Sequence, residues 1–236
     1  MSKQNELAQL ADAVTVDGGK VGIGTSPTLP LDIVSNGAAD ALKIRARPSS
    51  DDYGTMTFYN NAGTTKWADI QSNVAKDLRF YTNGGTLHMK IDASGRVTKP
   101  NQPYFNVQKS SSQNNITAGA YTTVTFGTEH VDTGGNFANN TFTAPVTGVY
   151  SLSIGVRLDN VDTSASYYNF WLQTSNRAYH QLRDVKFTQD SIFIFAMNVI
   201  ADMDANDTAV LQIQQQGGAT QTDINPSTFF QGYLLG

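Results

Sequence analysis

The chain has 236 residues, a formal net charge of −4, no cysteine, and only 15 % Asp, Glu, Lys and Arg, whereas a typical soluble domain is about one quarter charged. The absence of cysteine excludes a disulfide framework and thiolate chemistry, and the slightly acidic balance argues against nucleic-acid binding. No run approaches the roughly 18 apolar residues of a membrane span, and the first residues lack the apolar segment of a secretory signal. About a third of the residues are Ser, Thr, Asn or Gln, so we expect a polar but mostly uncharged surface.

Residues 2–13 are the only stretch with a helical pattern. Leu7, Leu10 and Val14 follow one another at i, i+3 and i+7, which places them on one face of a helix. A helix this short is marginal in water. It either docks onto a partner or is a frayed polar terminus.

From Val14 the hydrophobic pattern changes to a period of two, which predicts strands. Gly-containing turns follow Val16 and Ile91, and both predict hairpins. The predicted strands before residue 100 are Val14–Val16, a strand at Val21, Leu42–Arg45, Thr55–Tyr59, Lys66–Ile70, Leu78–Tyr81, Thr86–Ile91 and a strand at Val97. The region has few large apolar side chains, so we expect several chains to share one core.

The segment Lys99–Pro103 contains two prolines, which disfavour helix and interrupt strand pairing. We therefore place a domain boundary there. The apolar density rises after it, and alternation in Val149–Leu158 predicts a half-buried strand. Ile192–Met197 is apolar on both faces, so we expect one face in the core and the other against a neighbouring subunit. The predicted strands are Tyr104–Val107, Tyr121–Phe126, Phe137–Phe142, Val149–Leu158, Tyr167–Leu172, Ile192–Ile200, Ala209–Gln214 and Phe229–Leu235. Their number and spacing predict a jelly-roll sandwich.

A motif in the region before residue 100 resembles a known family. Gly22-Ile-Gly-Thr-Ser-Pro27, followed by Leu31-Asp-Ile33, resembles the shaft segments of bacteriophage tail fibres, and the turn at Ile91–Val97 is similar to it. The resemblance implies a trimeric shaft. Gly22 and Gly24 agree with it, because glycine permits close backbone approach where chains crowd around a shared axis.

A second resemblance covers residues 104 to 236. Phe142, Pro145, Gly148 and Tyr150 form a pattern similar to the F-x-A-P-x-x-G-x-Y of the globular head of complement component C1q, and Phe230, Gly232 and Tyr233 lie in a segment similar to its last strand. The resemblance implies the jelly roll shared with the tumour necrosis factor family, and a compact homotrimer with aromatic residues near its axis. The turn at Asp207 lacks the glycine that usually precedes this aspartate, and the fold itself specifies no ligand.

No pattern indicates a cofactor or an enzyme. Asp202, Asp204, Asn206 and Asp207 resemble the start of a calcium loop but lack its glycine and its distant glutamate, and turn chemistry explains these residue types equally well. His88, His130 and His180 lie on three segments without metal-ligand spacing. Nucleophile-elbow, P-loop and dinucleotide-binding motifs are absent. We predict no metal, no cofactor and no catalytic activity.

The best candidate for recognition is the segment Gln173–Asp184, interpreted as a loop between strands. We predict that Arg177, Tyr179, His180 and Arg183 bind a receptor there, because rings, amides and guanidinium groups suit a sugar face and its hydroxyls. The alternative is an ordinary solvated loop. Trp171 is either an exposed anchor or, as is more usual on a strand, a core or interface residue.

The sequence therefore predicts an all-β, homotrimeric bacteriophage fibre made in the host cytoplasm and localised to the virion. Residues 1–13 would attach to other virion proteins through Leu7 and Leu10, residues 14–100 would form an intertwined shaft, and residues 101–236 would form a knob, with no further domain after it. The knob would bind a host glycan or protein, with neither nucleic-acid binding nor membrane insertion. The alternative is a head-decoration or joint fibre whose knob serves mainly to trimerise the chain; a polysaccharide-degrading enzyme is a third, less favoured class.

Overall fold

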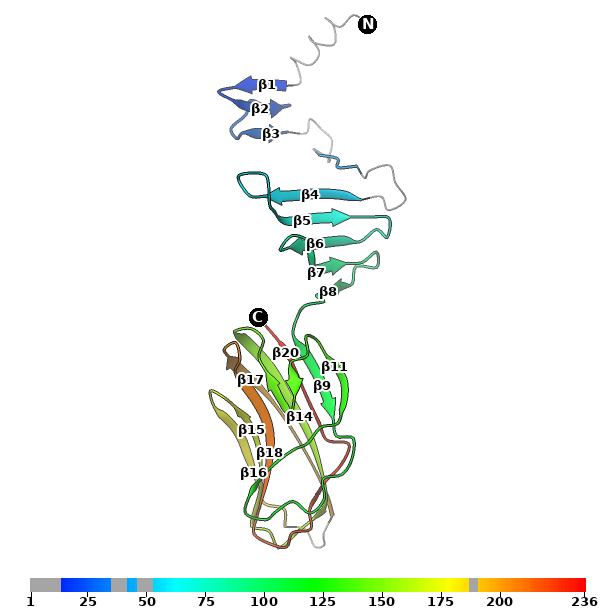
Figure 1. Ribbon diagram of the computed structural model, residues 1–236, viewed down its shortest axis with the longest axis vertical. Coiled ribbons are helices and arrows are strands. Elements are labelled where there is room, and N and C mark those ends of the chain that lie inside the picture. The colour runs from blue at the N-terminus through cyan, green and yellow to red at the C-terminus, as the bar shows by residue number, and fades with distance from the viewer. Residues whose placement is uncertain (1–13, 35–41, 46–52, 187–190) are drawn as a thin grey trace, which may run out of the picture. The chain divides into compact units, whose positions relative to one another are not determined.

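The structure, a computed structural model, describes residues 14–34, 42–45, 53–186 and 191–236, and the regular elements in these ranges are all β strands (Figure 1). This confirms the all-β prediction. The helix predicted over residues 2–13, with Leu7 and Leu10, lies outside the described residues. The chain divides into two compact units between Thr98 and Lys99. None of the described residues form a helix that is long and apolar enough to cross a membrane.

The first unit begins with a three-stranded sheet in the order β1-β2-β3. Gly18 and Gly19 both have positive φ, 52° and 81°, and they close the predicted hairpin between β1 and β2. Strand β3 then pairs in parallel with β2. The three strands are β1 (Val14–Asp17), β2 (Lys20–Ile23) and β3 (Leu31–Ile33).

Gly22 is required here by contacts within one chain. A Cβ atom at this position would collide with the Thr25 carbonyl oxygen and would lie 3.0 Å from Pro27 Cδ. The segment after β2 folds back over the strand, so only glycine leaves room for it. Crowding between chains was the predicted reason for this glycine, whereas the structure gives a reason within one chain.

The rest of the first unit is an antiparallel meander of five strands in the order β4-β5-β6-β7-β8 (Figure 1). The strands are β4 (Gly54–Tyr59), β5 (Lys66–Ser72), β6 (Leu78–Thr82), β7 (Thr86–Ile91) and β8 (Val97–Thr98). The strand predicted over Leu42–Arg45 is wrong, because none of the described strands pairs with it. Ile44 instead lines a shallow pocket beside Met56, Ile70 and Leu78.

One face of this meander is apolar and incompletely covered. The register places Met56, Ile70, Phe80 and Met89 in one row across β4 to β7. Met56 and its neighbour Phe58 on the same face are 41 % and 47 % exposed. All large hydrophobic side chains that are fully buried among the described residues belong to the second unit. The first unit therefore lacks a closed core of its own in a single chain.

The second unit is a sandwich of two antiparallel sheets (Figure 1). The first, called the β14 sheet, has the order β11-β9-β20-β14-β17, with the short β19 paired to β14. Its strands are β9 (Tyr104–Gln108), β11 (Thr128–Asp132), β14 (Gly148–Val161), β17 (Ser191–Met203), β19 (Asp223–Ile224) and β20 (Phe229–Leu234).

The second sheet, called the β15 sheet, has the order β12-β13-β18-β15-β16, with β10 also paired to β18. Its strands are β10 (Tyr121–Thr123), β12 (Phe137–Ala138), β13 (Thr141–Thr143), β15 (Tyr167–Thr174), β16 (Ala178–Arg183) and β18 (Thr208–Gln216). The two sheets with their alternating buried positions make the predicted jelly roll.

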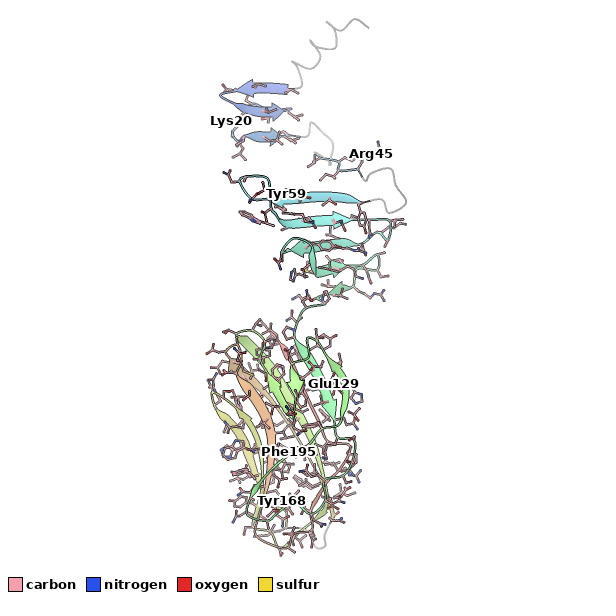
Figure 2. All side chains as sticks on the ribbon, viewed as in Figure 1. Lys20, Arg45, Tyr59, Glu129, Tyr168 and Phe195 are labelled. Carbon is pink, nitrogen blue, oxygen red and sulfur yellow. The ribbon has the colours of Figure 1, made fainter. Side chains whose placement is uncertain are left out.

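Aromatic rings fill the core between the sheets. Phe105 lies 4.5 Å from Phe142 and 4.9 Å from Phe230 between ring centroids, and Phe170 stacks on Phe195 at 4.3 Å. Tyr168, labelled with Phe195 in Figure 2, is completely buried. These contacts join residues of both sheets, so they hold the sandwich together.

Three local predictions in this unit were wrong. The segment Phe137–Phe142 is a hairpin rather than one strand, because Asn139 and Asn140 both have positive φ, a conformation that asparagine tolerates. The predicted strand Tyr121–Phe126 ends at Thr123. The predicted loop Gln173–Asp184 contains the strand β16, which pairs with β15. Each face of this edge strand mixes apolar and polar residues, so its sequence lacks the alternation that indicates a strand.

Candidate functional site

The residues that resemble the C1q signature form the framework of the sandwich. Phe142, Tyr150 and Phe230 are fully buried. The Tyr150 hydroxyl donates a 2.7 Å hydrogen bond to the Val146 carbonyl, which fixes the exposed Pro145 turn between β13 and β14. Burial raises the pKa of the Tyr150 phenol, so the hydroxyl remains a donor at neutral pH.

Two signature glycines let the last strand pack closely. A Cβ at Gly232 would lie 2.6 Å from Leu152 Cδ2 and 2.8 Å from Phe105 Cε1, and a Cβ at Gly148 would lie 2.6 Å from Leu234 Cδ1. Tyr233, by contrast, points out of the sandwich and is 51 % exposed. The signature therefore combines packing positions with one surface aromatic.

The four residues predicted to bind a receptor do not share one surface. Arg177 lies in the turn before β16, with Nη2 2.7 Å from Asp202 Oδ2. Tyr179 packs against the core, and its hydroxyl donates to the Ile200 carbonyl at 3.3 Å. The Arg183 guanidinium carbon lies 5.3 Å from the centre of the Phe195 ring. These three side chains all contact β17, whereas His180 lies on the opposite face of β16, because neighbouring residues of a strand point to opposite faces.

His180, the fourth of these residues, points away from the core. It stacks on Trp171 with ring centroids 4.8 Å apart, and Tyr121 packs edge-on against the same tryptophan, also at 4.8 Å. The sequence left Trp171 either as an exposed anchor or as a core or interface residue, and its side chain lies on the outward face of β15 beside His180. The three rings come from three strands, so only the pairing of β10, β18, β15 and β16 brings them together.

The acidic segment Asp202–Asp207 comprises the end of β17 and a hydrogen-bonded turn after it. Asp207 Oδ2 accepts bonds from the Asp204 backbone N–H at 2.8 Å and from Asn176 Nδ2 at 2.9 Å. Asn206 has φ 76°, a left-handed conformation that asparagine tolerates. In the described part of the chain, no three His, Asp or Glu side chains form a group that could hold a metal ion.

Lys109 is the most deeply buried cation of the second unit, at 3 % exposure. Its Nζ donates to Gln113 Oε1 at 3.2 Å, to the Thr125 carbonyl at 2.9 Å and to Thr125 Oγ1 at 3.1 Å. Burial lowers the pKa of this amine, because the charged form loses hydration. The three bonds tie the segment after β9 to the segment after β10, which is a structural role.

The β14 sheet has an unusually apolar outer edge. β17 is its last strand, and the side chains of Ile192, Ile194 and Ile200 on the outward face are 51 %, 71 % and 66 % exposed. The opposite face of the strand packs on the core through residues such as Phe195. A long edge strand with exposed isoleucines promotes association unless a partner covers it.

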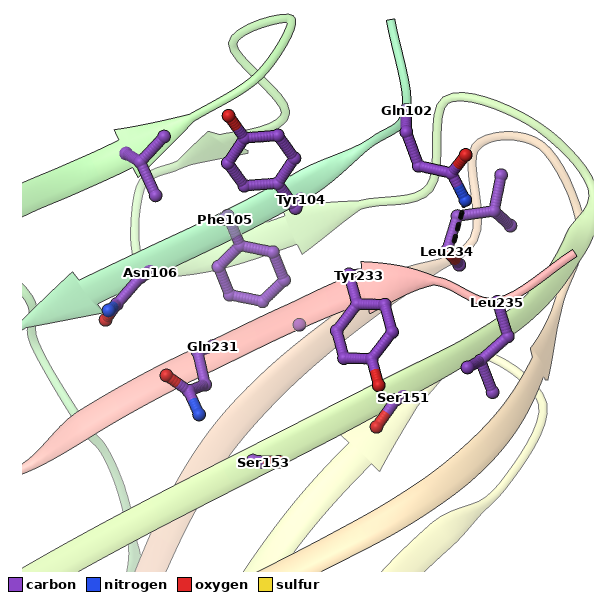
Figure 3. Close-up of a pocket in the computed structure, with 12 residues that line it drawn as sticks. Gln102, Tyr104, Phe105, Asn106, Ser151, Ser153, Gln231, Tyr233, Leu234 and Leu235 are labelled. Carbon is purple, nitrogen blue, oxygen red and sulfur yellow. Dashed lines mark hydrogen bonds between the residues drawn. The ribbon is translucent and has the colours of Figure 1, made fainter. Parts of the chain in front are cut away.

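A groove crosses the same sheet beside this edge (Figure 3). It has a volume of about 610 Å³. The side chains of Tyr104 and Tyr233 stand over it, Ser151 and Ser153 form part of its floor, and Leu235 lies at one end (Figure 3). Gln102 Nε2 donates a 2.6 Å hydrogen bond to the Leu234 carbonyl, which fixes the segment before β9 along the rim. The groove is a mixed aromatic and polar surface suited to a protein partner.

The two antiparallel sheets and the core between them define a jelly-roll domain. The family model of the C1q domain matches residues 105–235, and the chain belongs to this family. The second unit is similar to the globular domain of zebrafish complement 1qA, with 15 % identity, 57 % of this chain and 98 % of that chain covered, and a TM-score of 0.44. It is also similar to murine APRIL, with 13 % identity, 57 % and 99 % covered, and a TM-score of 0.42. No curated protein matches the chain.

Proposed function

We propose that this protein is a homotrimeric virion fibre of a bacteriophage whose C1q-type unit attaches the particle to the host cell surface. The observation that carries the proposal is the combination, in one chain, of a C1q-type sandwich and a β-rich unit that lacks a closed core. The motif Gly22–Pro27, which resembles tail-fibre shafts, supports the bacteriophage assignment. In this proposal the chain has no catalytic activity, and residues 1–13 attach it to other virion proteins.

Two different surfaces of the β14 sheet support the trimer in this proposal. The exposed isoleucines of β17 and the groove between Tyr104 and Tyr233 are different patches of one subunit. A contact between two different patches is heterologous, so copies joined by it close into a ring or grow into a filament. In a closed ring of three, the isoleucine edge of each subunit packs against the groove of the next.

The first unit supports the same stoichiometry. The apolar row of Met56, Ile70, Phe80 and Met89 has only partial cover in one chain. Three copies of the meander that face one another would bury these rows against a common axis. This would also explain the low charge of the chain, because three close copies of a charged surface would repel one another.

Light scattering on the full chain tests the assembly. We expect a mass three times the 25.5 kDa of the chain. A stable monomer at micromolar concentration would contradict both surface arguments.

Adsorption tests the attachment role. Labelled full-length protein should bind saturably to cells of the host strain and compete with phage adsorption. Saturable binding without competition, or antibody labelling of the capsid rather than the tail, would favour the alternative of a head-decoration or joint fibre. No binding at all would contradict adhesion.

A further inference from the structure

The outward face of the β15 sheet carries a continuous group of aromatic and amide side chains. Trp171 lies opposite His180 of β16 and Gln212 of β18. In the next row, Gln214 of β18 lies between Asn169 of β15 and Tyr121 of β10. The rings of His180, Trp171 and Tyr121 are in contact, with centroid distances of 4.8 Å on each side of the tryptophan. We call this group of rings and amides the aromatic platform.

Hydrogen bonds hold the platform in place. Trp171 Nε1 donates to Gln173 Oε1 at 2.7 Å, and Asn169 Nδ2 donates to the Tyr121 hydroxyl at 3.1 Å. The Asn169 side chain is buried, and its Oδ1 has no hydrogen-bond partner in the structure. Tyr121 and His180 remain exposed. The rings are thus fixed before any ligand arrives, which reduces the entropy lost on binding.

The whole face is uncharged. Every strand position of the β15 sheet whose side chain points away from the core lacks Asp, Glu, Lys and Arg, from the Thr143 and Thr208 pair at one end to the Tyr167 and Gln216 pair at the other. The outward face of the β14 sheet differs, since Arg157 lies beside Ile194 there. An uncharged face gives no attraction to phosphate, nucleic acid or acidic polysaccharide.

We propose that the aromatic platform binds a neutral glycan. The C–H face of a pyranose ring packs on exposed aromatic rings, while its hydroxyls exchange hydrogen bonds with amides and imidazole. The platform supplies both kinds of group without any charge. Strands β16, β15, β18 and β10 lie about 4.8 Å apart, so the platform extends over the width of an oligosaccharide rather than of one sugar.

This inference rests on the proposed attachment function and names its ligand class. The isoleucine edge and the groove that we assign to trimer contacts belong to the β14 sheet, so the outward face of the other sheet stays open. Three copies of a weak sugar site on one particle would bind a repetitive surface glycan far more tightly than one copy.

Tryptophan fluorescence provides a direct test because the chain has only two tryptophans, Trp67 and Trp171. The variant Trp67→Phe leaves Trp171 as the reporter, and Trp171→Phe leaves Trp67, which belongs to the other unit. The full-length protein is first screened on an array of neutral, sialylated and sulfated glycans. Titration of the bound neutral glycan should change the emission of Trp67→Phe and leave the emission of Trp171→Phe unchanged.

Substitutions in the Trp67→Phe background then test the contacts. We expect Tyr121→Ala and His180→Ala each to weaken glycan binding by about tenfold, the effect of losing one ring contact of about 1.4 kcal/mol. Two matched controls, Tyr59→Ala in the first unit and His130→Ala on β11, remove exposed residues of the same types and should change binding by less than about twofold. Trimer mass and melting temperature confirm that each variant is folded.

The outcomes separate this proposal from the attachment function. If no neutral glycan binds, if charged glycans bind in preference, or if the platform variants bind as well as the controls, the platform assignment is overturned. Should the protein still adhere to host cells in that case, the receptor is of another class, such as a protein, and the attachment role stands. Glycan binding at the platform without adhesion to cells would support the platform and contradict the attachment role.

Discussion

The substitution Ile194→Asp tests the trimer contact most directly. Ile194 is 71 % exposed in the single chain, and full burial of an isoleucine side chain contributes about 1.5–3 kcal/mol. Covering the exposed part would therefore contribute about 1–2 kcal/mol to each contact, or about 3–6 kcal/mol over the three contacts of a ring. That amount corresponds to a factor of about 10² to 10⁴ in the trimer dissociation constant. The aspartate adds a further cost, because its charge would be desolvated in the interface.

Sedimentation velocity over a concentration series measures this effect. Val146→Asp is the matched control, since Val146 is an exposed β-branched residue in the turn before β14. We expect the Ile194→Asp protein to dissociate at concentrations at which wild type and Val146→Asp remain trimers. Equal dissociation constants for all three proteins would refute the assignment of β17 to the interface. Equal weakening by both substitutions would also refute it.

Three further predictions concern the sandwich itself. Gly232→Ala should destabilise it by about 1–3 kcal/mol in urea unfolding, because the added methyl group meets Leu152 and Phe105 in a filled core; an unchanged midpoint would show that the last strand can shift. Tyr150→Phe should cost about 1 kcal/mol by the same assay, since the Val146 carbonyl loses its donor, and an equal or greater stability would contradict a role for this bond. Burial lowers the folded-state pKa of Lys109 below its ordinary 10.5, so the unfolded chain holds more protons between the two values and stability rises with pH across that window. The free energy of unfolding of wild type relative to Lys109→Met should therefore increase as the pH approaches 10.5, and a decrease would show that the charged form is the favoured one in the fold.

Strand alternation made most of the sandwich predictable. In β14 the residues Tyr150, Leu152, Ile154, Val156 and Leu158 alternate with more polar ones, and all five are buried. Gly18 and Gly19 predicted a hairpin because few other residues adopt positive φ at both central positions of a tight turn. These features depend on residues close together in the chain, so they can be predicted from a single sequence.

The candidate surfaces were less predictable because they depend on pairing between distant strands. The segment Gln173–Asp184 looked like a loop, since both faces of β16 carry polar or exposed residues and an edge strand needs no buried face. Placing Arg177, Tyr179, His180 and Arg183 on one loop grouped three residues that contact β17 with His180, which lies on the opposite face of β16. The prediction for Ile192–Met197 was better founded: one face packs on the core, and the other is exposed in the single chain.

The sequence by itself determined the all-β class and a boundary near Pro100, because periodicity, proline and glycine act through local backbone geometry. The C1q-type residues came from the resemblance of their motif to that family. The low charge of the chain pointed only to an uncharged polar surface. The tertiary structure alone decided where the candidate surfaces lie. Register across four strands gathers Tyr121, Trp171 and His180 into one platform, and sheet order makes β17 an exposed edge. Both depend on hydrogen bonding between segments far apart in the chain, which no local pattern encodes.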